Sequence, residues 1–397
     1  MSPVRSVLIA GASAGGLATA EALRRKGYTG TLTLLGAERE PPYDRPPLSK
    51  QVLSGAWEPH RARLRSPEAL AALDAEFLLG DPAVGFHAHR REVTTAAGRT
   101  LTADAIVIAT GVTARTLPAQ RGVRGSHVVR NLDDTLALRS DLLSARRVAV
   151  IGDGVLGAEA AATARQMGLE VTLIGPQPAP MTEQLGPLVA GHLTGLHLRN
   201  GVVWHGGVLL DRLHTHGDRV TGLRLSDGTE LEADVVVTAV GCVPATGWLE
   251  NSGLNLDDGV VCDAYCRAAP GIWAVGDVAR WQHEGLGRLV RLENRTNASE
   301  QALAVASDIL GDGRPYLPVP YFWTDQFDAR LQIYGIASPD ARAEIVEGDP
   351  SDGRFVVRFE GPLGPESVIG WKMPKQARLQ RASLVDRYTR PQQPVAS

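Results

Sequence analysis

The chain has 397 residues, of which 44% are hydrophobic and 21% are charged, and its formal net charge is −3. This length accommodates two or three domains and excludes a single small module. No apolar stretch approaches the length needed to span a bilayer, and there is no overall basic field, so we expect no membrane insertion and no nucleic-acid partner.

The cysteines and the N-terminal segment indicate a reducing, cytoplasmic compartment. Cys242, Cys262 and Cys266 are odd in number and lack the paired spacings of zinc sites or disulfide frameworks. The apolar run at 7–10 is too short to be the core of a signal peptide. The two close histidine pairs, His87/His89 and His214/His216, have no third ligand nearby, so we predict no metal site.

The first forty residues have the pattern of a nucleotide-binding unit. An apolar strand at 7–10 leads into the turn Gly11-Ala12-Ser13-Ala14-Gly15-Gly16, helix formers follow at 17–26, and a second strand is expected at 31–35. Such a turn lets a pyrophosphate approach backbone N–H groups at a helix N-terminus. Because Glu38 follows the second strand, where a carboxylate can bind a ribose, we predict nucleotide binding here over a purely structural turn.

The same pattern recurs near residue 150. A strand at 147–151 leads into Gly152-Asp153-Gly154-Val155-Leu156-Gly157, a helix is expected at 158–167, and a strand at 170–174. The glycine spacing is complete, but the second strand ends at Gly175-Pro176-Gln177. That segment offers neither an acid for a ribose nor an arginine for a 2′-phosphate, so the choice between NADH and NADPH stays open.

The remaining segments complete a three-part architecture. Apolar runs at 105–108, 233–238 and 272–275 suit buried parallel strands, and 298–310 is expected to be a helix. Short alternating segments after about residue 318 indicate an antiparallel sheet. We therefore predict an α/β protein with two Rossmann-like dinucleotide-binding domains, one formed by 1–112 with 242–319 and one by 113–241, and a C-terminal α+β domain at 320–397.

Several segments together resemble a known family. They are the stretch Pro42-Tyr43-Asp44-Arg45-Pro46-Pro47-Leu48-Ser49-Lys50, the two glycine-rich turns, Ala109-Thr110-Gly111, Gly276-Asp277 and Tyr321-Phe322-Trp323-Thr324-Asp325-Gln326. In order and spacing this set resembles the oxygenase-coupled, NAD(P)H-dependent ferredoxin and rubredoxin reductases. These proteins belong to the FAD-dependent pyridine nucleotide-disulfide oxidoreductases and have a glutathione-reductase-like fold. The resemblance covers nearly the whole chain.

The resemblance implies two sets of cofactor residues. In the first domain, FAD would be bound by Gly11, Ser13, Ala14, Gly15, Glu38, Arg39, Arg45, Lys50, Ala83, Ala109, Thr110, Gly111, Arg115, Gly276, Asp277, Glu293 and Trp323. In the second domain, NADH or NADPH would be bound by Gly152, Gly154, Leu156, Gly157, Glu159 and Gly241. Within the first set, the turn would hold the pyrophosphate, Glu38 the adenosine ribose and Asp277 the ribityl chain.

The resemblance also implies three catalytic residues, Lys50, Glu159 and Trp323. A cation beside the reducible end of a flavin stabilises the anion formed on reduction, and a paired glutamate limits the desolvation cost of that cation. Trp323 would lie beside the ring system. The competing interpretations are an ordinary surface lysine and a tryptophan of the core.

The function implied by the resemblance is electron transfer. Relatives that reduce disulfides carry a cysteine pair after the first turn, whereas this chain has no cysteine before Cys242. The implied cycle is hydride transfer from NADH or NADPH to FAD, followed by single-electron transfer to a ferredoxin-type iron–sulfur protein that serves an oxygenase. The protein would be a monomer or a homodimer. Two alternatives stay open: a stand-alone FAD enzyme acting on a small molecule with a degenerate nicotinamide site, and a flavin-containing sensor.

Three departures from the family pattern concern the nicotinamide side and the C-terminal face. Gly175 replaces an acid, Asn294-Arg295 replaces the usual His-Trp, and Lys372-Met373-Pro374-Lys375 replaces an asparagine-arginine segment. Together with Arg378 and Arg381, the two lysines of this last segment form a pattern that can place positive charge along one helix face. Such a face either steers an acidic ferredoxin or is simply solvated.

Overall fold

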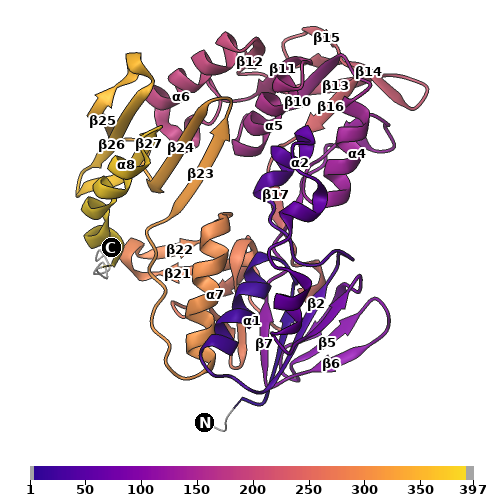
Figure 1. Ribbon diagram of the computed structural model, residues 1–397, viewed down its shortest axis with the longest axis vertical. Coiled ribbons are helices and arrows are strands. Elements are labelled where there is room, and N and C mark those ends of the chain that lie inside the picture. The colour runs from indigo at the N-terminus through magenta and orange to yellow at the C-terminus, as the bar shows by residue number, and fades with distance from the viewer. Residues whose placement is uncertain (1–3, 390–397) are drawn as a thin grey trace.

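The computed structural model describes residues 4–389, and its N-terminal part is built on a six-stranded sheet. The strand order is β19-β20-β7-β1-β2-β3, with only β19 antiparallel to its neighbour. Helices α1 and α7 lie side by side next to the sheet (Figure 1). The bounds are β1 Ser6–Ala10, α1 Ala14–Arg25, β2 Thr31–Gly36, β3 Glu76–Leu79, β7 Ala105–Ile108, β19 Arg267–Ala269, β20 Ile272–Ala274 and α7 Arg295–Ile309.

A second, five-stranded parallel sheet forms the middle of the chain. Its order is β12-β11-β10-β16-β9. Its elements are β9 Ser126–His127, α4 Leu132–Leu142, β10 Arg147–Ile151, α5 Val155–Gln166, β11 Glu170–Gly175, α6 Thr182–Arg199, β12 Val202–Gly206 and β16 Val235–Thr238. The two sheets are therefore separate Rossmann-like units, as the internal repetition of the sequence predicts.

The two glycine-rich turns have the same backbone geometry. Gly11 and Gly152 directly follow β1 and β10 and have φ angles of +123° and +112°, which L residues other than glycine rarely adopt. In α1 and α5, a Cβ on Gly16 would lie 1.8 Å from the carbonyl oxygen of Gly11, and a Cβ on Gly157 would lie 1.8 Å from that of Gly152. Only glycine therefore allows each helix to start this close to its strand.

The C-terminal part is a five-stranded antiparallel sheet in the order β23-β24-β27-β26-β25. Its buried face packs against α6, where Leu185, Val189 and Leu193 meet Leu331 and Phe355. Its elements are β23 Tyr321–Gln326, β24 Ala329–Gly335, β25 Arg342–Asp349, β26 Arg354–Gly361, β27 Gly364–Trp371, α8 Pro374–Gln380 and α9 Val385–Thr389.

Three small sheets, two connecting strands and two short helices complete the set of α-helices and strands in the described part of the chain. Three-stranded sheets are formed by β4 Ala83–His87, β5 Glu92–Thr95 and β6 Thr100–Thr102, by β13 Leu210–His216, β14 Arg219–Leu225 and β15 Glu230–Glu232, and by β18 Val260–Cys262, β21 Ala279–His283 and β22 Arg288–Val290. The chain leaves the first unit through β8 Val112–Ala114 and returns through β17 Cys242–Pro244, and these two strands pair with each other. Short helices α2 Gln51–Ser54 and α3 Pro67–Ala71 follow β2.

One segment of the N-terminal part packs on the second unit. Leu48, Val52 and Leu53 share a buried cluster with Leu138 of α4 and Ala161 of α5. Figure 1 shows α2 beside α4, away from the first sheet. Residues 43–62 therefore pack against the second unit, although they belong to the N-terminal part of the chain.

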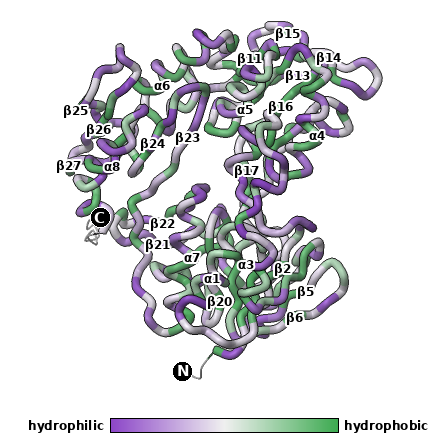
Figure 2. Tube along the Cα trace, in the orientation of Figure 1, coloured by the Kyte–Doolittle hydropathy of each residue, from purple (hydrophilic) through white to green (hydrophobic). Residues whose placement is uncertain are grey.

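The predicted strands at 105–108 and 147–151 agree with β7 and β10 residue for residue. Helices α1, α5 and α7 each begin three residues earlier than predicted. In α1 and α5, the last residues of the glycine-rich turn form the first turn of the helix. Helix α6 is not among the predicted elements; it contains Gly186 and Pro187 and kinks there. Hydrophobic segments concentrate inside the units and polar segments along the outer loops (Figure 2). Within residues 4–389, no helix is both long and apolar enough to cross a membrane.

Candidate functional site

A cavity of about 530 Å³ lies where the three parts meet. Ser13, Ala14 and Gly15 of the first turn line it, as do residues of the second turn, including Gly154. The C-terminal sheet contributes Trp323 from β23. Both glycine-rich turns therefore open onto one shared space, of a size typical for small-molecule and cofactor sites.

The residues around this cavity fit a dinucleotide. The N-terminus of α1 faces the cavity, and Ser13, its N-cap residue, makes no capping hydrogen bond with its side chain. Free backbone N–H groups at a helix start attract a pyrophosphate. At Gly154, a Cβ would have no atom within 4 Å, so the second turn also leaves room for a ligand. The donors and the open space match what FAD and a nicotinamide nucleotide require.

An ion pair between Asp277 and Arg130 lies at the cavity wall. Asp277 Oδ2 is 3.5 Å from Arg130 Nη2. Burial raises the pKa of Asp277, and the neighbouring Arg130 opposes this rise. Burial and the nearby Arg45 lower the pKa of Arg130. The wall thus holds both a hydrogen-bonding carboxyl group and a cation suited to a phosphate.

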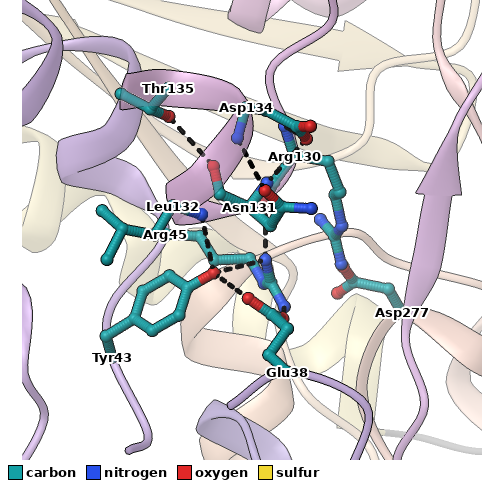
Figure 3. A network of polar contacts seen from close by, with 9 residues as sticks. All are labelled: Glu38, Tyr43, Arg45, Arg130, Asn131, Leu132, Asp134, Thr135 and Asp277. Atoms are coloured by element: carbon teal, nitrogen blue, oxygen red, sulfur yellow. Dashed lines mark hydrogen bonds and ion pairs between the residues drawn. The ribbon is translucent and has the colours of Figure 1, made fainter. Parts of the chain in front are cut away.

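Figure 3 shows how Glu38 is bound beside this pair. Arg45 Nη2 donates to Glu38 Oε1 at 2.7 Å, and the hydroxyl of Tyr43 donates to Oε2. Arg45 Nη1 donates to the carbonyl oxygen of Arg130 at 2.6 Å, and the Leu132 N–H donates to the Tyr43 hydroxyl at 3.0 Å. The network ties the end of β2 to the start of α4. Glu38 itself does not line the cavity, so its role on a ribose stays a prediction.

Lys50 and Glu159 form a buried ion pair at the cavity. Lys50 Nζ lies 2.6 Å from Glu159 Oε2, and the two side chains are 12% and 6% exposed. The Ser49 hydroxyl donates to the same oxygen at 2.6 Å, and the Thr324 hydroxyl of β23 donates to Oε1 at 2.9 Å. Three donors satisfy the carboxylate, which is the condition under which a buried ion pair is tolerated. All three parts of the molecule meet at Glu159.

Trp323 lines the cavity and is the first ring of an aromatic stack that continues to residues outside the lining. Its ring stacks on Tyr321 at a centroid distance of 6.2 Å, and Tyr321 stacks on Tyr334 at 4.7 Å. The positive charges of Arg378 and Arg381, from α8 and the turn after it, act on Tyr334 and oppose the rise in its pKa that burial causes. The stack therefore connects the cavity wall with the basic C-terminal segment.

Most of the predicted site residues line the cavity. These are Ser13, Ala14, Gly15, Arg45, Lys50, Ala109, Thr110, Gly111, Gly154, Leu156, Glu159, Gly241, Gly276, Asp277, Glu293 and Trp323. The glycines that let the helices dock, Gly11, Gly152 and Gly157, lie behind the wall.

Three other predicted residues do not themselves line the cavity. Ala83 is in β4, and Arg39 packs beside Gly80. Arg115 is exposed and donates to the carbonyl oxygen of Cys242 at 3.1 Å. For these three residues, contact with FAD stays a prediction.

Sequence reasoning missed several lining residues, among them Arg130, Cys242 and Arg295. Burial and the nearby Glu293 carboxylate raise the pKa of the Cys242 thiol to about 12. Arg295 pairs with Asp44. The only local signal at Arg130 is the capping box of Asn131, which marks a helix start but not a site. No group of potential metal ligands is found among the described residues.

The fold and the site define an oxidoreductase of the two-dinucleotide class, in which both nucleotide units face one reaction cavity. Residues 5–302 match the family model described as pyridine nucleotide-disulphide oxidoreductase, and residues 321–362 match a reductase C-terminal model. The chain therefore belongs to the pyridine nucleotide-disulphide oxidoreductase family.

Characterised relatives cover nearly the whole chain. Rhodocoxin reductase from Rhodococcus erythropolis is 32% identical over 368 residues, which is 91% of this chain and 86% of the relative. The ferredoxin–NAD(+) reductase subunit of the benzene 1,2-dioxygenase system from Pseudomonas putida is 35% identical over 386 residues, covering 96% and 89%. The crystal structure of a covalent putidaredoxin reductase–putidaredoxin complex matches with a TM-score of 0.91 and 31% identity, covering 96% of this chain and 93% of the other.

Proposed function

We propose that this protein is an FAD-dependent reductase that takes hydride from NADH or NADPH and passes single electrons to a ferredoxin-type iron–sulfur protein serving an oxygenase. The observation that carries the proposal is the shared cavity, in which both glycine-rich turns, the Lys50–Glu159 pair and Trp323 meet. The names of the relatives support the same partner class. We further propose that the protein works in the cytoplasm.

Bound FAD would accept a hydride equivalent and release electrons one at a time. The chain's own residues bind and orient. The two helix N-termini hold the pyrophosphates, and Lys50 places a positive charge at the wall, where it stabilises negative charge in the cavity. Glu159 fixes the position of that charge through its 2.6 Å contact with Lys50.

The chain has no thiol relay for these electrons. Cys242, Cys262 and Cys266 are all free, and the segment 45–50, where disulfide-reducing relatives would need a cysteine pair, contains none. The acceptor must therefore come close to the cavity. The aromatic stack of Trp323, Tyr321 and Tyr334 makes the face beside α8 the favoured approach, since its basic residues complement an acidic ferredoxin.

Anaerobic mixing with NADH or NADPH tests the proposal. Rapid bleaching of the flavin absorbance, followed by reoxidation on adding a [2Fe–2S] ferredoxin, is the expected result. An absence of bleaching at millimolar nucleotide would contradict it and favour the stand-alone flavoenzyme. Bleaching followed by slow turnover even with abundant ferricyanide would favour the sensor.

The role of Lys50 is tested by comparing Lys50→Met with Lys50→Arg. Because Lys50→Met removes the positive charge and leaves Glu159 without its ion-pair partner, we expect slower bleaching, by at least about tenfold. Lys50→Arg keeps the charge and should retain more of the rate. Equal rates for wild type and Lys50→Met, measured by stopped flow, would remove Lys50 from the proposed machinery.

A further inference from the structure

We infer that Asp153 supplies the ribose-selecting carboxylate of the nicotinamide site, in place of the acid that is missing at position 175. The site would then accept a nucleotide with a free 2′-hydroxyl and disfavour one with a 2′-phosphate, so NADH is the donor. This inference rests on the proposed nicotinamide-binding role of the second unit. It assigns a residue of the glycine-rich turn to a task that normally belongs to the end of the second strand.

The first observation is steric. Gly175 is the last residue of β11, where the ribose-binding acid of a dinucleotide fold normally stands. A Cβ on Gly175 would lie 2.2 Å from Cγ and 2.3 Å from Oδ2 of Asp153. The carboxylate of Asp153 thus fills the space that a side chain at position 175 would take. A side chain at position 175 is therefore incompatible with Asp153 in this position.

The second observation is that this carboxylate is held in place. The backbone N–H of Gln177 donates to Asp153 Oδ2 at 2.8 Å, and Gln177 Nε2 donates to Oδ1 at 2.9 Å. The Gln177 amide is itself fixed, because its Oε1 accepts from the Glu183 N–H at 2.7 Å. Asp153 is only 4% exposed and does not itself line the cavity, whereas its chain neighbour Gly154 does. Each carboxylate oxygen keeps a second lone pair with which to accept from a ribose hydroxyl.

The third observation is the charge of the surrounding segment. No lysine or arginine occurs between Arg165 and Arg199, which spans the end of α5, β11, the loop after it and nearly all of α6. A 2′-phosphate at the end of β11 would meet the negative charge of Asp153 without a cation from this segment to offset it. Repulsion between these like charges would weaken the binding of NADP⁺ relative to that of NAD⁺.

The test is direct binding to the oxidised, FAD-loaded protein, measured by calorimetric titration with NAD⁺ and with NADP⁺. Wild type should bind NAD⁺ at least about tenfold more tightly than NADP⁺. Asp153→Asn has nearly the same shape but no charge, so it should reduce this ratio at least several-fold. Glu183→Gln, which changes an exposed acid in the first turn of α6, is the matched control and should leave the ratio within about twofold, because exposed charges are screened.

A reciprocal exchange sharpens the test. Gly175→Glu alone should abolish NAD⁺ binding, because the new side chain collides with Asp153. Adding Asp153→Gly should restore binding and the preference for NAD⁺. Glycine is needed at 153 because even its Cβ lies 2.4 Å from the Cβ position at 175. Full FAD content and an unchanged flavin spectrum verify that each variant is folded, since FAD is assigned to the other unit.

The outcomes separate the two levels of the argument. An unchanged ratio in Asp153→Asn, or a wild-type preference for NADP⁺, would overturn the role of Asp153 while leaving the reductase proposal intact. A double variant that binds no better than Gly175→Glu would also overturn it. A wild-type protein that binds neither nucleotide would instead remove the proposed function.

Discussion

Asp277 illustrates how burial at a cavity wall sets the behaviour of a single residue. Its pKa is raised by burial, so the folded chain holds this proton more tightly than the unfolded chain does. A carboxyl group shifted in this direction contributes stability below its unfolded pKa. That contribution is lost as the pH rises through the folded pKa.

The prediction concerns the FAD-free protein. Between about pH 4 and pH 7, the melting temperature of wild type should fall more steeply with pH than that of Asp277→Asn, which has no proton to lose. Thermal melts in a series of buffers provide the measurement. Asp218→Asn, at an exposed position, is the control and should follow wild type. Parallel curves for wild type and Asp277→Asn would contradict the assigned shift.

At the scale of elements, two glycines three residues apart in the second turn have different tasks. Gly157 lets α5 start against the Gly152 carbonyl group, whereas Gly154 faces open space. Gly157→Ala should therefore lower the free energy of unfolding by more than about 2 kcal/mol, because its Cβ collides with backbone that cannot yield. Gly154→Ala should fold normally but bind the nicotinamide nucleotide more weakly.

Denaturant unfolding and nucleotide titration separate these two effects. Gly191→Ala in α6, where a Cβ also meets nothing within 4 Å, is a control for replacing glycine in a helix. It should be neutral or stabilising by up to about 1 kcal/mol. Equal loss of stability in Gly154→Ala and Gly157→Ala would show that the turn tolerates no side chain at all.

Helix α8 carries basic residues of the face that we propose as the docking site for the ferredoxin. It is shorter than the spacing of its basic residues suggested: Lys372 precedes it and pairs with Asp328, and Arg381 follows it. Lys375 and Arg378 remain exposed on α8.

Reversing both charges, Lys375→Glu with Arg378→Glu, should slow ferredoxin reduction at low salt by about tenfold or more. The difference should shrink at high salt, where charges are screened. The rate with ferricyanide, an acceptor that needs no protein docking face, provides the control and should change much less. A ferredoxin rate that is unaffected at low salt would place the docking face elsewhere.

At the scale of the whole molecule, the cavity is lined by all three parts, so its ligand should hold them together. Lining residues come from the first turn, the second turn and β23. A ligand that binds only the folded state stabilises it by about 2.7 kcal/mol at a free concentration of 100 times Kd. We therefore expect FAD to raise the melting temperature, and scanning calorimetry of the FAD-free protein to show a broader or divided transition. A single, equally sharp transition with and without FAD would contradict this coupling.

The amino-acid sequence by itself determined the two nucleotide units. Strands such as 105–108 and 147–151, and the turns at Gly11 and Gly152, follow from apolar runs and from backbone angles that favour glycine. These features depend on neighbours in the chain, which is why they can be predicted without knowing the fold. The resemblance to a family added Lys50 and Glu159, which the structure brings to 2.6 Å from each other.

Only the tertiary structure decided how distant segments share the cavity. Arg130 joins Asp277 across nearly 150 residues of sequence, and no local pattern marks it. Likewise, Gly175 taken alone indicates the loss of a ribose-binding acid, whereas the structure has the carboxylate of Asp153 in the same space. The shape and charge of a site are set by side chains that come from elements far apart in the sequence. A missing group at one position is therefore interpretable only together with the residue that packs against it.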